Sequence, residues 1–170
     1  MEEATKKAGI LGIGNMLLSD ESFGVHVIGF LEEHYSFPES VTVLDGGTAG
    51  IYMAPFLEEH DPILVVDVVN FDDATPGSLY TFSAEDARNG AMQPKMSPHQ
   101  LGILEILDIC KLRGIEPDCV DFYCVVPGSL ETGLAMTEVV ADQVEKVSGI
   151  LVKRLRDSGH TILLKEETDA

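Results

Sequence analysis

Short apolar runs alternate along the chain with longer stretches in which apolar residues recur every three or four positions. The short runs predict β-strands, and the longer stretches predict helices. Strands are expected over residues 8–13, 41–44, 62–69, 78–82 and 120–126, with a further edge strand over 161–164. Helices are expected over residues 20–35, 49–60, 98–113 and 137–156, and a loop with a short helical start over 84–96.

The order of these elements predicts the fold class. Alternating strands and helices favour an α/β protein, namely a three-layer αβα sandwich of the phosphorylase/hydrolase-like kind with a mostly parallel, twisted sheet of about five strands. The unbroken apolar run at residues 63–66 fits a strand that helices cover on both faces. A length of 170 residues without repeats or linkers predicts a single domain over residues 1–170.

Polar residues gather where the first three strands end. Glu21 follows the first strand and its Gly-rich segment 12–15. Residues 45–48 follow the second strand, Asp67 closes the third, and His99 begins a later helix. In a parallel sheet, the loops that follow the strands, and the first turns of the helices after those loops, lie at one edge of the sheet. We therefore expect all of these residues at the carboxyl edge, where ligands bind in such folds.

Glu21, Asp67 and His99 have the side chains of a small metal site, because two carboxylates and one imidazole leave positions open for water or substrate. Each also has a structural explanation. Glu21 would complement the dipole of a helix start, with Ser19 or Asp20 as N-cap. Asp67 would cap a neighbouring helix, and His99 would be an exposed residue of a first turn. Asp67 is the strongest candidate, since a carboxylate inside an apolar strand is costly unless it is paired or metal-bound.

Two glycine-containing segments need separate interpretation. In Asp45-Gly46-Gly47-Thr48 the glycines permit positive φ or the close approach of another chain, although a tight turn between strand and helix also explains them. The segment 12–14 resembles the start of a dinucleotide-binding loop, but Leu17 stands where the third glycine belongs. Nucleotide binding is therefore disfavoured.

Charge and composition limit which binding partners and which cellular compartment can be expected for this protein. With 29 acidic and 11 basic residues the net charge is −18, which argues against nucleic acid and anionic membranes as partners. The chain shows no signal-peptide pattern and no apolar run of about 20 residues, so we expect a cytoplasmic protein. Three cysteines without C-x-x-C spacing predict neither a disulfide framework nor a zinc knuckle.

Taken together, these motifs resemble those of the maturation endopeptidases of NiFe hydrogenases, which trim the C-terminus of the hydrogenase large subunit. The order and spacing of the motifs carry the resemblance across nearly the whole chain. The matching segments are GIGNMLLSDE at 12–21 with Gly24, LDGGTAG at 44–50, Asp67, KMSPHQLG at 95–102 and PGSLE at 127–131.

The resemblance implies a hydrogenase maturation protease domain and a role for each candidate residue. Glu21, Asp67 and His99 would form the catalytic and metal-sensing site, and residues 45–48 (Asp45, Gly46, Gly47 and Thr48) would recognise the substrate. The expected substrate is a large-subunit precursor already loaded with nickel, cut once behind a basic residue near its C-terminus. The precursor would supply the nickel, and zinc or cadmium could substitute in the site. A monomer is expected.

The residues leave the chemistry open. A metal ion could activate the attacking water and polarise the scissile carbonyl, or a carboxylate could act as general base in an aspartyl-type mechanism, with nickel serving only for recognition. A general metallopeptidase or esterase is a rival enzyme hypothesis. A nickel-dependent binding or chaperone module without proteolysis is the rival that involves no enzyme. We also expect the acidic surface to steer the protein toward a basic region of the precursor.

Overall fold

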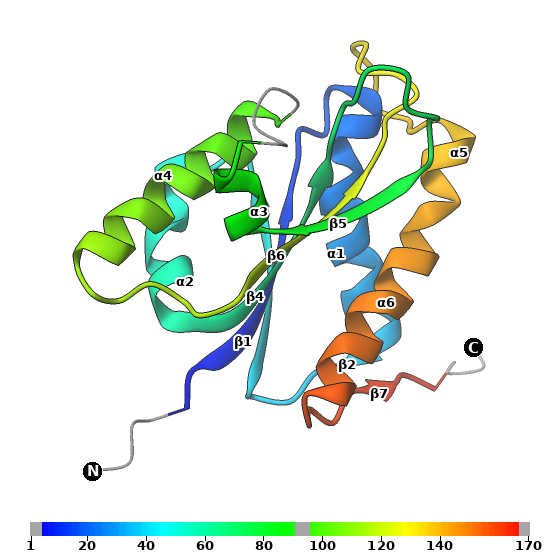
Figure 1. Ribbon diagram of the computed structural model, residues 1–170. Coiled ribbons are helices and arrows are strands. Elements are labelled where there is room, and N and C mark those ends of the chain that lie inside the picture. Colours follow the sequence, from blue (N-terminus) through cyan, green and yellow to red (C-terminus); the bar gives the residue numbers. More distant parts are fainter. Residues whose placement is uncertain (1–4, 91–95, 167–170) are drawn as a thin grey trace.

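Five strands form one sheet in the computed structural model, which describes residues 5–90 and 96–166 (Figure 1). They lie in the order β3-β1-β4-β6-β5. Their bounds are Lys7–Ile13 for β1, Val41–Gly47 for β3, His60–Val68 for β4, Leu79–Ser83 for β5 and Val120–Val125 for β6. The first four in spatial order are parallel, and β5 is antiparallel to β6 at the edge. The expected, mostly parallel sheet is confirmed.

Helices cover both faces of this sheet (Figure 1). They are α1 (Phe23–His34), α2 (Ala54–Glu59), α3 (Ala84–Arg88), α4 (Pro98–Leu112), α5 (Glu138–Ala141) and α6 (Gln143–Asp157). In β4, Leu64 and Val66 belong to the core beneath α1 and α6, whereas Ile63 and Val65 belong to the core beneath α2 and α4. Both faces of the strand are buried, which explains its unbroken apolar sequence and confirms the three-layer sandwich.

Several helix boundaries differ from those expected. The helix expected over residues 20–35 begins only at Phe23, because the 3₁₀ turn η1 (Ser19–Ser22) precedes it. The helix expected over 49–60 consists of a second 3₁₀ turn, η2 (Gly50–Met53), and the short α2, whose Pro55 occupies the first turn. The helix expected over 137–156 is divided at Asp142 into α5 and α6.

The edge strand expected over residues 161–164 does not join the main sheet. The two residues that form β7 (Leu163–Leu164) pair antiparallel with β2 (Tyr35–Ser36). The sequence pattern did not predict β2, because Tyr35 continues the apolar spacing of the helix expected over residues 20–35. Lys165 then donates its backbone N–H to the carbonyl of His34, so this small sheet ties the tail to the end of α1. Lys95, part of the 95–102 motif, lies outside the described residues. None of the helices within 5–90 and 96–166 combines the length and the hydropathy needed to cross a bilayer.

Two glycines bring α1 close to the sheet. A Cβ atom on Gly24 would overlap the carbonyl oxygens of Ile13 and Val66, which lie at the ends of β1 and β4. A Cβ atom on Gly12 would overlap the carbonyl of Gly24. Only glycine permits this approach, so the Gly-rich segment serves helix–strand packing. The approach also fixes η1, and with it Glu21, at the carboxyl edge of the sheet.

Candidate active site

The three residues predicted to form the catalytic and metal site all lie at the carboxyl edge of the sheet. Asp67 is the next-to-last residue of β4, Glu21 lies in η1, the next element after β1, and His99 is the second residue of α4. The strand order reverses between the neighbours β1 and β4. After β1 the chain goes on to β3 at one edge of the sheet, and after β4 it goes on to β5 and β6 toward the other edge. Ligands of open α/β sheets bind at such a point.

Asp67 is a fully buried carboxylate with few partners. Its Oδ1 accepts a hydrogen bond from the backbone N–H of Val68 (2.8 Å), and its Oδ2 accepts one from the hydroxyl of Ser97 (3.1 Å). Burial raises the pKa of this carboxyl from its ordinary 3.8 to about 7, and the nearby Glu21 contributes to the rise, while the hydrogen bonds from Val68 and Ser97 oppose it. Asp67 is therefore close to half protonated near neutral pH.

The start of α4 is anchored to the strand that carries Asp67. Ser97 is the N-cap, and it forms a capping box with Gln100, in which each side chain accepts a hydrogen bond from the other residue's backbone N–H. The buried Gln100 amide also donates to the carbonyl of Val68 (2.8 Å). The alternative role of Asp67, capping a neighbouring helix, is thus partly confirmed, because its carboxylate accepts a hydrogen bond from the hydroxyl of the N-cap residue Ser97.

Glu21 and His99 face each other across the edge of the sheet. His99 Nδ1 lies 3.6 Å from Glu21 Oε1, and both side chains are mostly buried. The His99 Nδ1 atom is itself inaccessible to solvent and has no hydrogen-bond partner among the described residues. Within residues 5–90 and 96–166, no group of three His, Cys, Asp or Glu side chains is arranged so that it could hold a metal ion. The metal site formed by Glu21, Asp67 and His99 therefore stays a prediction.

The predicted substrate-recognition residues lie beside His99. Asp45, Gly46 and Gly47 belong to the end of β3 and not to a turn after it, because a β-bulge at Gly46 extends the strand's pairing with β1. Gly47 has φ +50° and donates its N–H to Asp45 Oδ1 (2.9 Å). A small pocket joins this segment to the start of α4, with Gly46, Gly47, Thr48 and His99 among its lining residues.

A fourth carboxylate, Asp20, is a structural centre that the sequence pattern did not single out. It is fully buried, and none of the side chains that the structure describes caps η1 or α1, so its expected role as N-cap is wrong. Its Oδ2 accepts hydrogen bonds from the N–H groups of Gly128 (2.7 Å) and Ser129 (2.9 Å). The Thr137 hydroxyl also donates to Oδ2 (2.8 Å), and the Thr137 N–H donates to Oδ1 (2.7 Å). Asp20 thus fixes the loop after β6 against η1.

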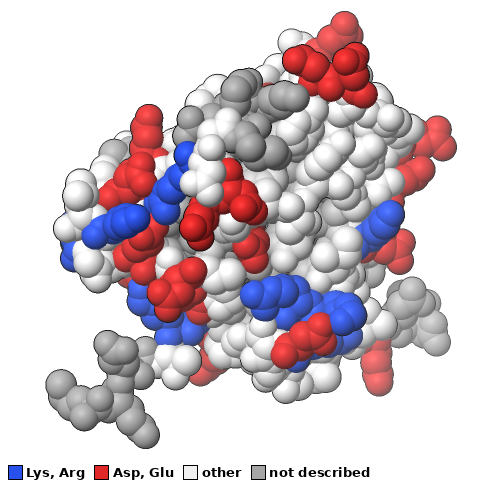
Figure 2. Space-filling view, in the orientation of Figure 1, with Lys and Arg blue, Asp and Glu red and all other residues white. Residues whose placement is uncertain are grey.

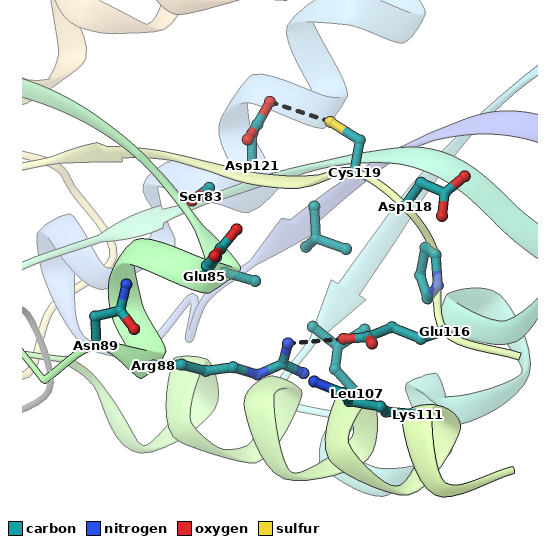
Figure 3. A pocket seen from close by; sticks show the side chains of 13 residues that line it. Ser83, Glu85, Arg88, Asn89, Leu107, Lys111, Glu116, Asp118, Cys119 and Asp121 are labelled. Carbon is teal, nitrogen blue, oxygen red and sulfur yellow. Dashed lines mark hydrogen bonds and ion pairs between the residues drawn. The ribbon is translucent and has the colours of Figure 1, made fainter. Parts of the chain in front are cut away.

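A larger cavity, of about 550 Å³, lies at the other end of β6 (Figure 3). Three of the charged side chains drawn there, those of Arg88, Glu116 and Asp121, meet partners within the protein. Arg88 pairs with Glu116 at 2.7 Å and, outside the cavity lining, with Asp108 at 3.0 Å. The thiol of Cys119 donates to Asp121 at 3.4 Å. None of the predicted site residues lines this cavity, so the carboxyl edge remains the candidate site.

Comparison with known proteins decides the family. A family model described as hydrogenase maturation protease matches residues 25–154. The hydrogenase 2 maturation protease of Escherichia coli (strain K12) is 32% identical over 157 residues, covering 92% of this chain and 95% of its own. The chain belongs to the hydrogenase maturation protease family. It is therefore a peptidase, as the motifs predicted.

Other members of the family support the same assignment. The hydrogenase expression/formation protein HupD of Rhodobacter capsulatus is 37% identical over 151 residues, covering 88% of this chain and 71% of its own. The solved structure of the hydrogenase maturating endopeptidase HybD from E. coli matches with a TM-score of 0.86 at 31% identity, covering 96% of this chain and 99% of that one. This structural match also confirms the predicted fold class.

Proposed function

We propose that this peptidase removes a short C-terminal extension from the nickel-loaded precursor of a hydrogenase large subunit. Membership of the family supports the choice of substrate. The single observation that best supports a hydrolytic site is Asp67, a buried carboxylate at the strand-order reversal that accepts a hydrogen bond from Ser97, two residues before His99. A carboxylate kept in this position against its desolvation cost needs a functional reason.

Asp67 acts as the general base in this proposal. Its carboxylate takes a proton from the water that adds to the scissile carbonyl, and the proton passes to the leaving amine as the C–N bond breaks. A base whose pKa lies near neutral is well matched to both transfers. Asp67 has no exposed surface, so precursor docking must open the start of α4, where the Ser97 hydroxyl covers Oδ2.

Glu21 and His99 recognise the nickel of the precursor in this proposal. Two donor atoms that each lie about 2.1 Å from a common ion are about 3 to 3.5 Å apart. The observed 3.6 Å between His99 Nδ1 and Glu21 Oε1 is close to that separation, and the imidazole nitrogen has no competing hydrogen bond from residues 5–90 and 96–166. Nickel arrives as part of the substrate, and zinc or cadmium would suit the same donors. The adjacent segment from Asp45 to Thr48 holds the chain that is to be cut.

The experiment is mass spectrometry of the precursor after incubation with the protein, with and without nickel. Shortening of the nickel-loaded precursor by one C-terminal peptide is expected from the wild type. A precursor that binds but keeps its full length would instead support the nickel-dependent binding module. Cleavage of unrelated peptides with added zinc would support a general metallopeptidase.

The acidic surface and the cellular setting form a second part of the proposal. Acidic side chains form several separate patches on the face drawn in Figure 2, with basic ones in smaller groups over α4 and the lower end of α6. With a net charge of −18, the protein is steered toward a basic region of the precursor, acting as a cytoplasmic monomer. Association rates that fall as salt rises would agree, and rates that are independent of salt would exclude steering.

A further inference from the structure

Two loop segments at the carboxyl edge expose large apolar side chains in an otherwise acidic protein. Leu17 and Met16 lie in the segment before η1, with 61% and 42% of their surface exposed. Leu134 and Leu130 lie in the loop after β6, with 72% and 42% exposed. Residues 8–19 contain no charged side chain, and residues 127–137 contain only Glu131. We call these two segments, residues 16–19 and 129–134, the apolar platform.

Backbone hydrogen bonds join the two segments of the platform. Ser19 donates its N–H to the carbonyl of Gly133 (2.9 Å), and Gly133 donates to the carbonyl of Leu17 (2.9 Å). The Ser19 hydroxyl also donates to the carbonyl of Glu131 (2.7 Å). The buried Asp20 carboxylate fastens both ends of the loop with its four hydrogen bonds. The exposed leucines are thus held in place before any partner binds, which lowers the entropy cost of binding.

The platform continues directly into the candidate active site. Glu21 follows Asp20 in the chain and donates its N–H to the carbonyl of Leu18, so it stands at the margin of the platform. A second copy of the chain bound permanently here would sit over the edge that carries Glu21 and His99. It would also bring two molecules of charge −18 together. The occupant that agrees with both facts is the protein substrate itself.

We propose that the apolar platform docks an uncharged, apolar face of the folded large-subunit precursor, at a distance from the peptide bond that is cut. The inference rests on the proposed function and adds a second contact, separate from nickel recognition. Exposed apolar patches beside a catalytic edge mark protein-binding surfaces, and a few large side chains in them carry most of the affinity.

The test measures precursor binding without cleavage. In an Asp67→Asn background, which prevents turnover in the proposed mechanism, calorimetry compares the affinity for the nickel-loaded precursor before and after L17Q/L134Q. We expect the double substitution to weaken binding about 10-fold or more. The matched control is Leu112→Gln, since Leu112 is 89% exposed at the other end of α4, and it should leave binding unchanged.

Each outcome distinguishes this inference from the proposed function. Unchanged affinity in L17Q/L134Q, or an equal loss in Leu112→Gln, would overturn the docking surface even if the wild type trims the precursor. Wild-type protein that binds through the platform but never shortens the precursor would overturn the proposed function alone. A wild-type dimer in sedimentation that L17Q/L134Q converts to a monomer would assign the platform to a second copy and exclude our proposal. Urea unfolding checks that the exposed substitutions leave the fold intact.

Discussion

Replacing Asp67 with asparagine should make the protein more stable while abolishing its activity. The side chain is fully buried, and asparagine has nearly the same shape. Its Oδ1 can still accept from the N–H of Val68, and its Nδ2 can donate to the Ser97 hydroxyl, which reverses one hydrogen bond without losing it. The substitution therefore removes the desolvation penalty of a carboxylate, whereas the second amide N–H and the hydroxyl hydrogen of Ser97 lose an acceptor, which costs about 1 to 3 kcal/mol.

The size and the pH window of the gain follow from the pKa of Asp67. Its folded-state value of about 7 lies above the ordinary 3.8, so this group contributes full stability below about pH 4. The contribution falls as pH rises from there, because the unfolded state ionises first, and the fall ends just above pH 7. At about 1.4 kcal/mol for each pKa unit, the total loss is about 4 kcal/mol. Asp67→Asn avoids it.

Urea unfolding of wild type and variant at intervals from pH 4 to pH 8 measures the effect. The difference in unfolding free energy should shift by about 4 kcal/mol in favour of Asp67→Asn between pH 4 and pH 8. Titrating groups that do not interact with Asp67 are common to both proteins, so their contributions cancel. A difference that stays constant with pH, or a variant that is less stable at pH 8, would refute the inference that the buried Asp67 carboxylate destabilises the fold.

Four further substitutions test the site and the framework around it. Gly24→Ala should destabilise the fold by about 3 kcal/mol, because its Cβ overlaps two strand carbonyls. Gly29→Ala, on the open side of the same helix, should stabilise the fold by about 1 kcal/mol. Equal effects of the two substitutions in urea unfolding would contradict the close approach of α1 to the sheet. Asp20→Ala should cost about 3 kcal/mol by leaving the donors of Gly128, Ser129 and Thr137 without their acceptor, and faster proteolysis of the loop after β6 would report the loss. Unchanged stability would contradict the anchoring role of Asp20. His99→Ala should fold normally in circular dichroism and leave the nickel-loaded precursor untrimmed, and normal trimming would remove His99 from the site.

The residues at the carboxyl edge could be predicted because each physical signal there was local. Glycines, an acid inside an apolar strand and a Ser-Pro helix start each appear within a few residues. The strand–helix order then placed Glu21, Asp67 and His99 on one edge of the sheet, as the structure confirms. Membership of the family likewise agrees with the motif resemblance.

The features that the sequence did not predict depend on contacts between distant segments. Asp20 was interpreted as a helix cap because its donors, from Gly128 to Thr137, lie more than a hundred residues away. The bulge at Gly46 depends on the register with β1 and cannot be found in its own segment. Tyr35 continued a helical pattern but pairs with Leu164 near the other end of the chain.

The measurement that most directly tests C-terminal processing is the mass of a hydrogenase large-subunit precursor after incubation with this protein. The nickel-loaded precursor should lose one short C-terminal peptide with the wild type, and it should keep its full mass with Asp67→Asn. The nickel-free precursor should keep its full mass with both proteins. A nickel-loaded precursor that keeps its full mass with wild type, or is trimmed equally by Asp67→Asn, would contradict the proposed function and its catalytic residue.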